Sequence, residues 1–110
     1  MKVSGTNLSM TRGDTESIAL RIKSGGTLSA GDTVDFTVRE DAESDVLLHK
    51  RVTEFTDGVA VIPIEPKDTE GLDFGTYRYD IQLTAADGTV ITLVKPARFT
   101  LTEEITYGGD

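Results

Sequence analysis

The sequence predicts an all-β protein, an antiparallel β-sandwich of seven to eight short strands. Two observations support this. Apolar residues alternate between two faces at period two, and turn-forming residues separate these stretches at intervals of about 8–12 residues. No stretch sustains the apolar period of about 3.6 residues that is typical of an amphipathic helix. The clearest alternation lies in residues 72–83, where Tyr77, Tyr79, Ile81 and Leu83 share one face.

The same stretch contains the spacing Leu-x-x-Gly-x-Tyr, formed by Leu72, Gly75 and Tyr77. This spacing resembles the tyrosine corner of immunoglobulin-like sandwiches, in which a Tyr hydroxyl near the start of a strand bonds to backbone a few residues upstream. We therefore expect an immunoglobulin-like antiparallel β-sandwich in which the Tyr77 hydroxyl makes that bond. Barrels share the strand pattern, so the pattern alone leaves a barrel open.

The expected strands follow one another without an internal repeat or a separate linker. They cover residues 7–11, 16–23, 32–39, 46–52, 59–64, 77–84, 90–94 and 97–103. A loose lead-in is expected at 1–7, a loop at 24–31, one helical turn between 65 and 73, and a mobile tail at 105–110.

Three details of strand facing can also be read from the sequence. In the strand 46–52 we expect Leu48 inside and Leu47 half-exposed. The nearly continuous apolar run 59–64 indicates burial on both faces or a strand with one end covered, and its Pro63 indicates a strand end or a sheet edge. Lys95-Pro96 is expected to mark a break or a bulge between two strands.

Length and composition limit the classes of protein that the chain can belong to. Its 110 residues predict a single domain, residues 1–110, with a core of about 7–106 and flexible ends. The chain has no Cys, which excludes a disulfide, a thiolate metal site and a cysteine nucleophile. Its net charge of −8 disfavours nucleic acid and anionic membranes as partners. The sequence has no apolar leader stretch at its N-terminus, so we expect a cytoplasmic location at synthesis.

Two charged motifs suggest a ligand, but a turn explains each of them better. Arg12-Gly13-Asp14 matches a cell-adhesion tripeptide, and it also fits a tight turn between the first two expected strands. Asp41, Glu43 and Asp45 alternate like the first ligands of a calcium loop. However, Val46 stands where that loop needs Gly and Val52 where it needs Glu, so we expect a solvated hairpin tip.

The sequence offers no catalytic constellation. His49 is the single histidine, and no Ser lies in a Gly-x-Ser-x-Gly elbow, so we interpret His49 as an outward-facing strand residue. One His without Cys makes a zinc site improbable on composition. We therefore predict no enzymatic activity, no cofactor, no metal and no catalytic residue.

Three stretches together resemble small immunoglobulin-like structural proteins of tailed phages and prophages, including the N-terminal domain of upper baseplate proteins. They are the opening 8–15 with its Arg-Gly-Asp-Thr turn, the strand 72–83, and the closing stretches 87–90 and 97–101. The resemblance covers about residues 7–106 and concerns structural motifs, so it supplies no catalytic or ligand residue. It implies a component of a virion, at the tail or baseplate.

Two functions are therefore expected to compete. The first is a non-enzymatic structural module of a phage or prophage particle that binds other virion proteins or itself, so that the assembled chain would reside in the virion. The contact elements would be the strand 7–11, with Leu8 and Met10, and the strand 46–52, with Leu47. The alternative is a carbohydrate- or surface-binding domain of a bacterial extracellular protein, although the chain has no Trp for a sugar platform.

Overall fold

Strands dominate the structure, a computed structural model that describes residues 1–21, 28, 30–41 and 43–103. Within these ranges the strands are β1 (Lys2–Ser4), β2 (Asn7–Thr11), β3 (Glu16–Arg21), β4 (Thr33–Arg39), β5 (Val46–Val52), β6 (Val59–Ile64), β7 (Gly75–Thr84) and β8 (Val90–Thr102). A five-residue helix, α1 (Pro66–Glu70), connects β6 to β7. The expected helical turn is therefore confirmed. The described part of the chain contains no helix that is both long and apolar enough to cross a membrane.

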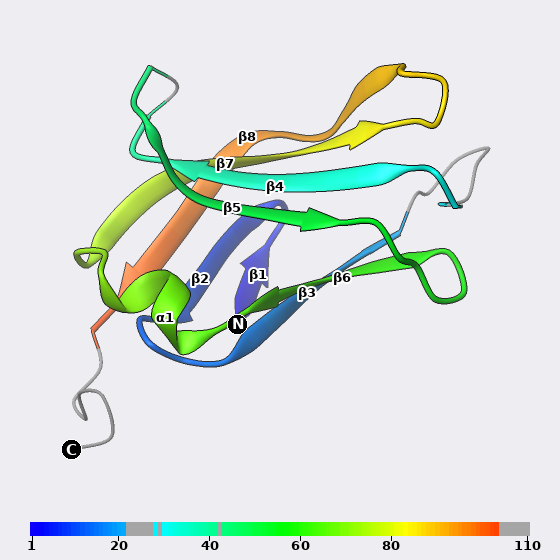
Figure 1. The fold of residues 1–110 in the computed structure, drawn as a ribbon. Coiled ribbons are helices and arrows are strands. Elements are labelled where there is room, and N and C mark those ends of the chain that lie inside the picture. The colour runs from blue at the N-terminus through cyan, green and yellow to red at the C-terminus, as the bar shows by residue number, and fades with distance from the viewer. Residues whose placement is uncertain (22–27, 29, 42, 104–110) are drawn as a thin grey trace.

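The strands form two layers, which confirms the predicted immunoglobulin-like sandwich. One sheet has six strands in the order β1-β2-β8-β7-β4-β5, and β3 pairs with β6 in the second layer (Figure 1). The described strands pair antiparallel, except that β2 runs parallel to β8. The core lies between the layers, and an aromatic cluster of Phe36, Tyr79 and Phe99 fills it with ring centroids 5.4–6.5 Å apart.

The core confirms the alternation read from the sequence. Strands β4 and β7 bury every second side chain, as period-two patterning requires when one face of a sheet meets water. In β5, Leu48 is 8% exposed and Leu47 is 41% exposed, as expected. In β8, register shifts on both sides of Ile81 confirm a bulge around Lys95 and Pro96.

Several expectations about the strands were wrong. Residues 2–4, expected as a loose lead-in, form β1, because their backbone pairs with β2 although all three side chains are exposed. The stretches 90–94 and 97–103 are one continuous strand rather than two. Strand β6 is not buried on both faces: Val61 is 51% exposed, because the two-stranded layer has water on its outer side. The expected loop 24–31 lies largely, and the tail 105–110 entirely, outside the described residues.

Candidate functional site

Three arginines lie in one row across the outer face of the six-stranded sheet. The strand register places Arg39 of β4 opposite Arg78 of β7, and Arg78 opposite Arg98 of β8. Directly opposed residues of an antiparallel pair share a face, and here that face points away from the core, since the neighbouring Val38, Tyr79 and Phe99 are buried. Arg78 and Arg98 are exposed, and Arg39 is half-buried.

This row is electrostatically unfavourable by itself, because like charges directly opposite one another destabilise a sheet. Arg39 is held in place, since its Nη1 donates to the carbonyl of Ser44 at 2.6 Å. Within the described residues, the side chains of Arg78 and Arg98 have neither an ion pair nor a hydrogen bond. Two adjacent guanidinium groups therefore present their donors to solvent in a chain whose net charge is −8.

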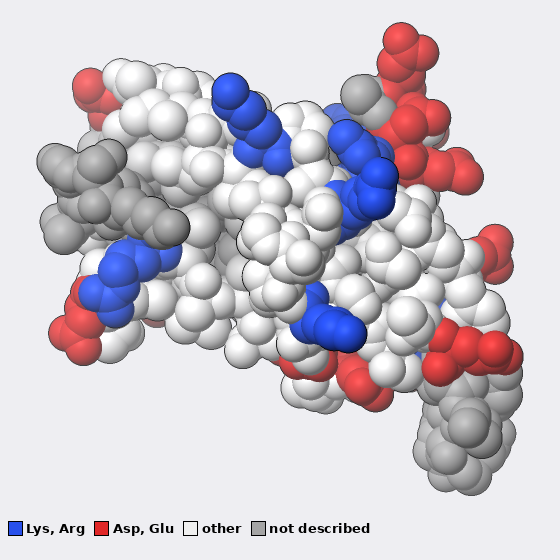
Figure 2. Space-filling model, turned by 180° about the vertical axis from the view of Figure 1, so that it is seen from behind, with Lys and Arg blue, Asp and Glu red and all other residues white. Residues whose placement is uncertain are grey.

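Charge is sorted on one face of the molecule (Figure 2). Seen from behind, Lys and Arg side chains lie over the middle of the surface, whereas most Asp and Glu side chains lie around its rim (Figure 2). The acidic side chains at the rim repel an anion, so the arginines attract it effectively only at short range, where their attraction is least screened by salt. The arrangement therefore favours short-range contact with an anionic group.

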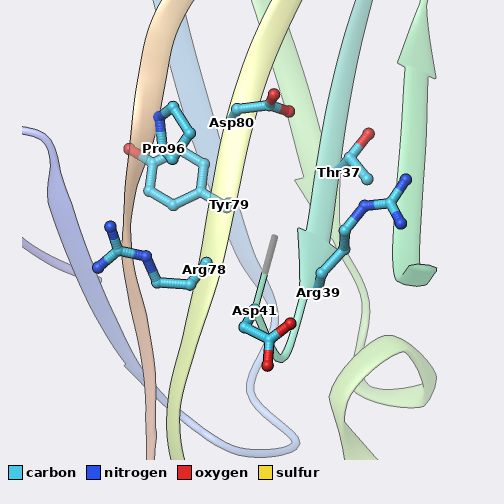
Figure 3. A pocket seen from close by; sticks show the side chains of 7 residues that line it. All are labelled: Thr37, Arg39, Asp41, Arg78, Tyr79, Asp80 and Pro96. Atoms are coloured by element: carbon cyan, nitrogen blue, oxygen red, sulfur yellow. The ribbon is translucent and has the colours of Figure 1, made fainter. Parts of the chain in front are cut away.

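A shallow hollow of about 190 Å³ lies beside the row. Its polar lining comes from Arg39, Arg78, Asp41, Asp80 and Thr37, and Pro96 forms one wall (Figure 3). The bulge in β8 places two residues, Lys95 and Pro96, opposite Asp80 alone, and this mismatch makes the hollow. Figure 3 shows the Arg39 guanidinium turned toward β5 and the Arg78 guanidinium turned toward β8, the strand that carries Arg98.

A second charged cluster on the same face is already neutralised. One oxygen of Asp35, Oδ1, lies 2.7 Å from His49 Nε2 and 2.9 Å from Arg51 Nε. Burial raises the pKa of Asp35, but hydrogen bonds and charge from Arg51 and His49 outweigh it and leave this pKa below its ordinary value. His49 is exposed on β5, which confirms that it is an outward-facing strand residue.

The tyrosine corner predicted from Leu72, Gly75 and Tyr77 is present. The Tyr77 hydroxyl donates to the carbonyl of Asp73 at 2.7 Å, and the Tyr77 side chain is buried. Gly75 has a φ of 142°, a backbone conformation that side-chain-bearing residues rarely adopt. Leu72 packs against the core, so the three residues together fix the entry into β7.

The Arg12-Gly13-Asp14 stretch is a structural turn, as interpreted. Gly13 has a φ of 85°, and its N–H donates to the Thr69 hydroxyl at 2.8 Å. The Arg12 side chain donates to the carbonyl of Leu72 at 3.0 Å, and its guanidinium carbon lies 4.1 Å from the centre of the Phe74 ring. The tripeptide therefore ties the β2–β3 turn to α1 and to the segment before β7, and its arginine is not displayed as an adhesion ligand.

The acidic stretch after β4 also folds as a turn. Asp41 Oδ1 accepts hydrogen bonds from the Ser44 hydroxyl and from the Glu43 N–H, both at 2.9 Å. These bonds lower the pKa of Asp41. Nowhere in the described ranges do three or more His, Cys, Asp or Glu side chains gather in a way that could hold a metal ion. Asp41, Glu43 and Asp45 therefore do not converge as calcium ligands would.

The residues expected to form an interface are separated by the fold. Leu8 and Met10 are 6% and 3% exposed, because both point into the core, so the expectation of surface contacts through them is wrong. Their strand β2 is paired on both sides, by β1 and β8, and does not form a sheet edge. Leu47 lies on the edge strand β5 with 41% of its surface exposed.

Sequence reasoning missed Arg78 and Arg98 as candidate ligand-binding residues. Each could be assigned to the outward face of its strand by alternation alone. Nothing in the sequence, however, indicates that they face each other, because the register between β7 and β8 is set by two bulges and a hairpin turn.

Comparison with known proteins supports the fold and corrects the expected role. No family model matches the chain, and no curated protein matches it. The crystal structure of CopC from Methylosinus trichosporium OB3b is similar in fold, with a TM-score of 0.52 and 14% sequence identity over 92% of this chain and 89% of CopC. At this identity the similarity shows the fold alone.

Nothing in the comparisons points to phage baseplate proteins. The expectation that this chain is a structural module of a phage or prophage particle is therefore corrected, because the similarity found is to CopC and no comparison leads to a phage protein. The resemblance of the three sequence stretches to small immunoglobulin-like phage proteins stays a prediction.

The described residues do not fit a copper site. Copper prefers imidazole, thiolate and thioether ligands. The single histidine, His49, bonds through Nε2 to Asp35 Oδ1, and the same oxygen accepts a hydrogen bond from Arg51 Nε. A metal cation at Asp35 would therefore meet the positive charge of Arg51. Of the two methionines, Met10 is buried in the core and Met1 packs against it. Copper handling is therefore not carried over to this chain.

Proposed function

We propose that this chain is a binding module that holds an anionic oxygen group, a carboxylate or a phosphate, on Arg78 and Arg98. The observation that carries the proposal is the register of β7 and β8, which places these two exposed guanidinium groups directly opposite each other without an acidic partner in the described residues. A guanidinium group presents donors in a planar fork that matches a carboxylate or phosphate, so two adjacent forks suit one anionic group between them.

The neighbouring residues support a ligand with a defined orientation. Arg39 is anchored by Ser44 and extends the positive row toward the hollow, and Asp80 and Asp41 line that hollow. A ligand that places its anionic group at Arg78 and Arg98 can therefore direct a neutral or cationic part toward Asp80. An extended peptide with an acidic side chain has this combination of groups.

The net charge of the chain favours a ligand with few anionic groups over a polyanion. A net charge of −8 repels a polyanion at long range, whereas contacts to two arginines act over a few ångströms. We therefore infer that nucleic acid and anionic membranes are not partners. The proposed role is binding without catalysis.

The proposal can be tested by titrating the labelled chain with citrate, inorganic phosphate and a short oligoglutamate peptide, and following its backbone and arginine side-chain NMR signals. Saturable shifts are expected at Arg78, Arg98 and their neighbours on β7 and β8. Neutralising either arginine, as Arg78→Gln or Arg98→Gln, should weaken binding by about tenfold or more, since a charge-assisted hydrogen bond contributes about 1.5–3 kcal/mol.

Arg51→Gln is the matched control, because Arg51 lies on the same outer face but is paired with Asp35. It should leave binding unchanged. Sodium chloride at equal ionic strength should produce no saturable shift. Equal losses in all three arginine variants, or shifts that follow ionic strength alone, would contradict a site at Arg78 and Arg98. Citrate and the peptide binding without phosphate would assign the site to carboxylates, and the reverse would assign it to phosphate.

A further inference from the structure

Among the residues that the structure describes, the first half of β8 is an open sheet edge. On the side of β2, β8 is paired along Phe99–Thr102, and Asn7 closes that ladder by accepting the Arg98 N–H on its side-chain oxygen at 3.0 Å. N-terminal to this point, no strand of the described chain pairs with β8 on that side. Figure 1 shows the β7–β8 hairpin extending beyond β2 at one end of the sheet.

This edge, residues 90–94, is chemically unlike the other edges of the two sheets. Its sequence is Val90-Ile91-Thr92-Leu93-Val94, without a charge or a proline. Exposed edge strands normally carry charged residues or proline, because these prevent the addition of another strand. The remaining edge strands do carry them: Lys2 in β1, Glu16 and Arg21 in β3, His49, Lys50 and Arg51 in β5, and Pro63 in β6.

The side chains at this edge are also exposed. Val90 is 58% and Ile91 is 47% exposed, although both lie in a regular, paired strand. Val90 and Thr92 are paired with Thr84 and Gln82 on the outer face, and Ile91 is paired with Leu83 on the core side. A strand added here would cover apolar surface on both faces of the sheet.

The hairpin geometry indicates which backbone groups are available. Ala85 donates its N–H to Thr89 at 2.8 Å, and Gly88 donates to Ala85 at 2.8 Å, which makes Ala85 and Thr89 the closing hydrogen-bonded pair. Hydrogen-bonded and non-hydrogen-bonded pairs alternate along an antiparallel ladder. Ile91 therefore bonds to Leu83, and the N–H and C=O groups of Val90 and Thr92 point to the open edge.

From these observations we infer that the edge 90–94 pairs with the same edge of a second copy of this chain. The pairing is antiparallel about a two-fold axis at Ile91, so that Val90 of each copy bonds to Thr92 of the other and the two six-stranded sheets become continuous. A two-fold axis requires a self-complementary patch, and an uncharged strand segment satisfies this requirement.

Charge complementarity supports the same register. Asp87 lies four residues before Ile91 and Lys95 lies four residues after it, and both are exposed. The two-fold axis therefore brings each Lys95 toward Asp87 of the other copy. Each copy carries a charge of −8, so the association should strengthen as salt screens the repulsion between the copies. Binding of an anion to Arg78 should weaken with salt, so the two proposals can be tested separately.

The first test is the mass in solution, by light scattering after size exclusion, over a series that reaches millimolar concentration. The expected result is a rise toward twice the chain mass of 11.9 kDa. Replacing two outward side chains at the edge, as Val90→Lys/Thr92→Lys, should restore the monomer, because four ammonium groups would meet at the axis. Val61→Lys is the matched control, since Val61 is 51% exposed on β6, and it should dimerise like the natural chain.

The second test examines the register. In the proposed pairing Ile91 faces Ile91 as a non-hydrogen-bonded pair, with Cα atoms about 4.5 Å apart, which suits a disulfide. The chain has no cysteine of its own, so Ile91→Cys introduces a single thiol. Mild oxidation should link it between copies much faster than the thiol of Val61→Cys. A natural chain that stays monomeric at millimolar concentration, a dimer that persists in Val90→Lys/Thr92→Lys, or equal cross-linking at residues 91 and 61 would each overturn the inference.

Discussion

Removing the hydroxyl of Tyr77 should lower the free energy of unfolding by about 1 kcal/mol. The substitution Tyr77→Phe keeps the ring, which is 8% exposed and packs in the core, and removes one hydrogen bond of 2.7 Å to the Asp73 carbonyl. No cavity is created, so the effect isolates the polar interaction that defines the tyrosine corner.

The structure decides where in the usual range this effect falls. Losing a hydrogen bond costs about 1–3 kcal/mol when the abandoned partner stays buried, and less when water can replace the lost group. Asp73 is exposed, so water can hydrate its carbonyl in the variant, and the cost should lie at the lower end of that range. For a domain of this size the matching decrease in Tm is about 4 °C.

Urea denaturation followed by tyrosine fluorescence or circular dichroism would measure the difference. Thr76→Val is a suitable control, because Thr76 lies next to Tyr77 but is exposed and has a single long contact, 3.3 Å, with the Thr100 hydroxyl. It should change the stability by less than about 0.5 kcal/mol. If Tyr77→Phe is as stable as the natural chain, the hydroxyl does not hold the entry into β7 and the energetic reasoning is refuted.

Three further predictions concern polar side chains of the folded chain and the pH dependence of its stability. Thr69→Val should lower the free energy of unfolding, measured by thermal denaturation, by about 1–2 kcal/mol, because it removes the acceptor of the Gly13 N–H. Thr69→Ser keeps that acceptor and should lower it by less. Asp68→Asn should lower the free energy of unfolding by about 2 kcal/mol at neutral pH, because Asp68 binds Lys50 Nζ at 2.7 Å between α1 and β5. Lys67→Gln removes an exposed ion pair with Glu65 and should lower it by less than about 0.5 kcal/mol. Burial raises the pKa of Asp68, but hydrogen bonds from Lys50 and the Glu65 N–H outweigh this effect and lower the pKa. The stability difference between the natural chain and Asp68→Asn should therefore be present above about pH 4. It should disappear as the pH falls through the lowered pKa. Burial raises the pKa of Tyr79, and burial together with the charges of Asp73 and Glu40 raises the pKa of Tyr77. Stability, measured by urea midpoints, should therefore fall as the pH rises above about 10. The fall should be less steep in Tyr77→Phe, which has one of these hydroxyls less.

The sequence was informative wherever a local pattern determines the structure. Alternation in β4 and β7 follows from the period of a strand with one wet face, and the hydroxyl bond of Tyr77 spans four residues. The turn at Arg12-Gly13-Asp14 follows from glycine's access to positive φ. In each case the physical cause lies within a few residues of its effect.

Sequence patterns gave wrong predictions where strand formation or side-chain burial depends on neighbouring strands and layers. Residues 2–4 have no apolar alternation, because β1 is an edge strand with exposed side chains, and its pairing with β2 alone makes it a strand. Val61 is exposed in an apolar run, because the outer face of the layer formed by β3 and β6 meets water. Leu8 and Met10 could not be separated from surface residues without knowing that their face of β2 packs into the core between the layers.

The amino-acid sequence by itself determined the class of fold, most strand positions, the tyrosine corner and an acidic surface that disfavours polyanions. Only the tertiary structure decided that Arg78 faces Arg98, that the bulge at Lys95 and Pro96 opens a hollow beside them, and that residues 90–94 form an uncharged open edge. The physical reason is that strand register is a relation between segments far apart in the chain. It is set by turn geometry, bulges and the packing of the core, and these act together only in the folded molecule.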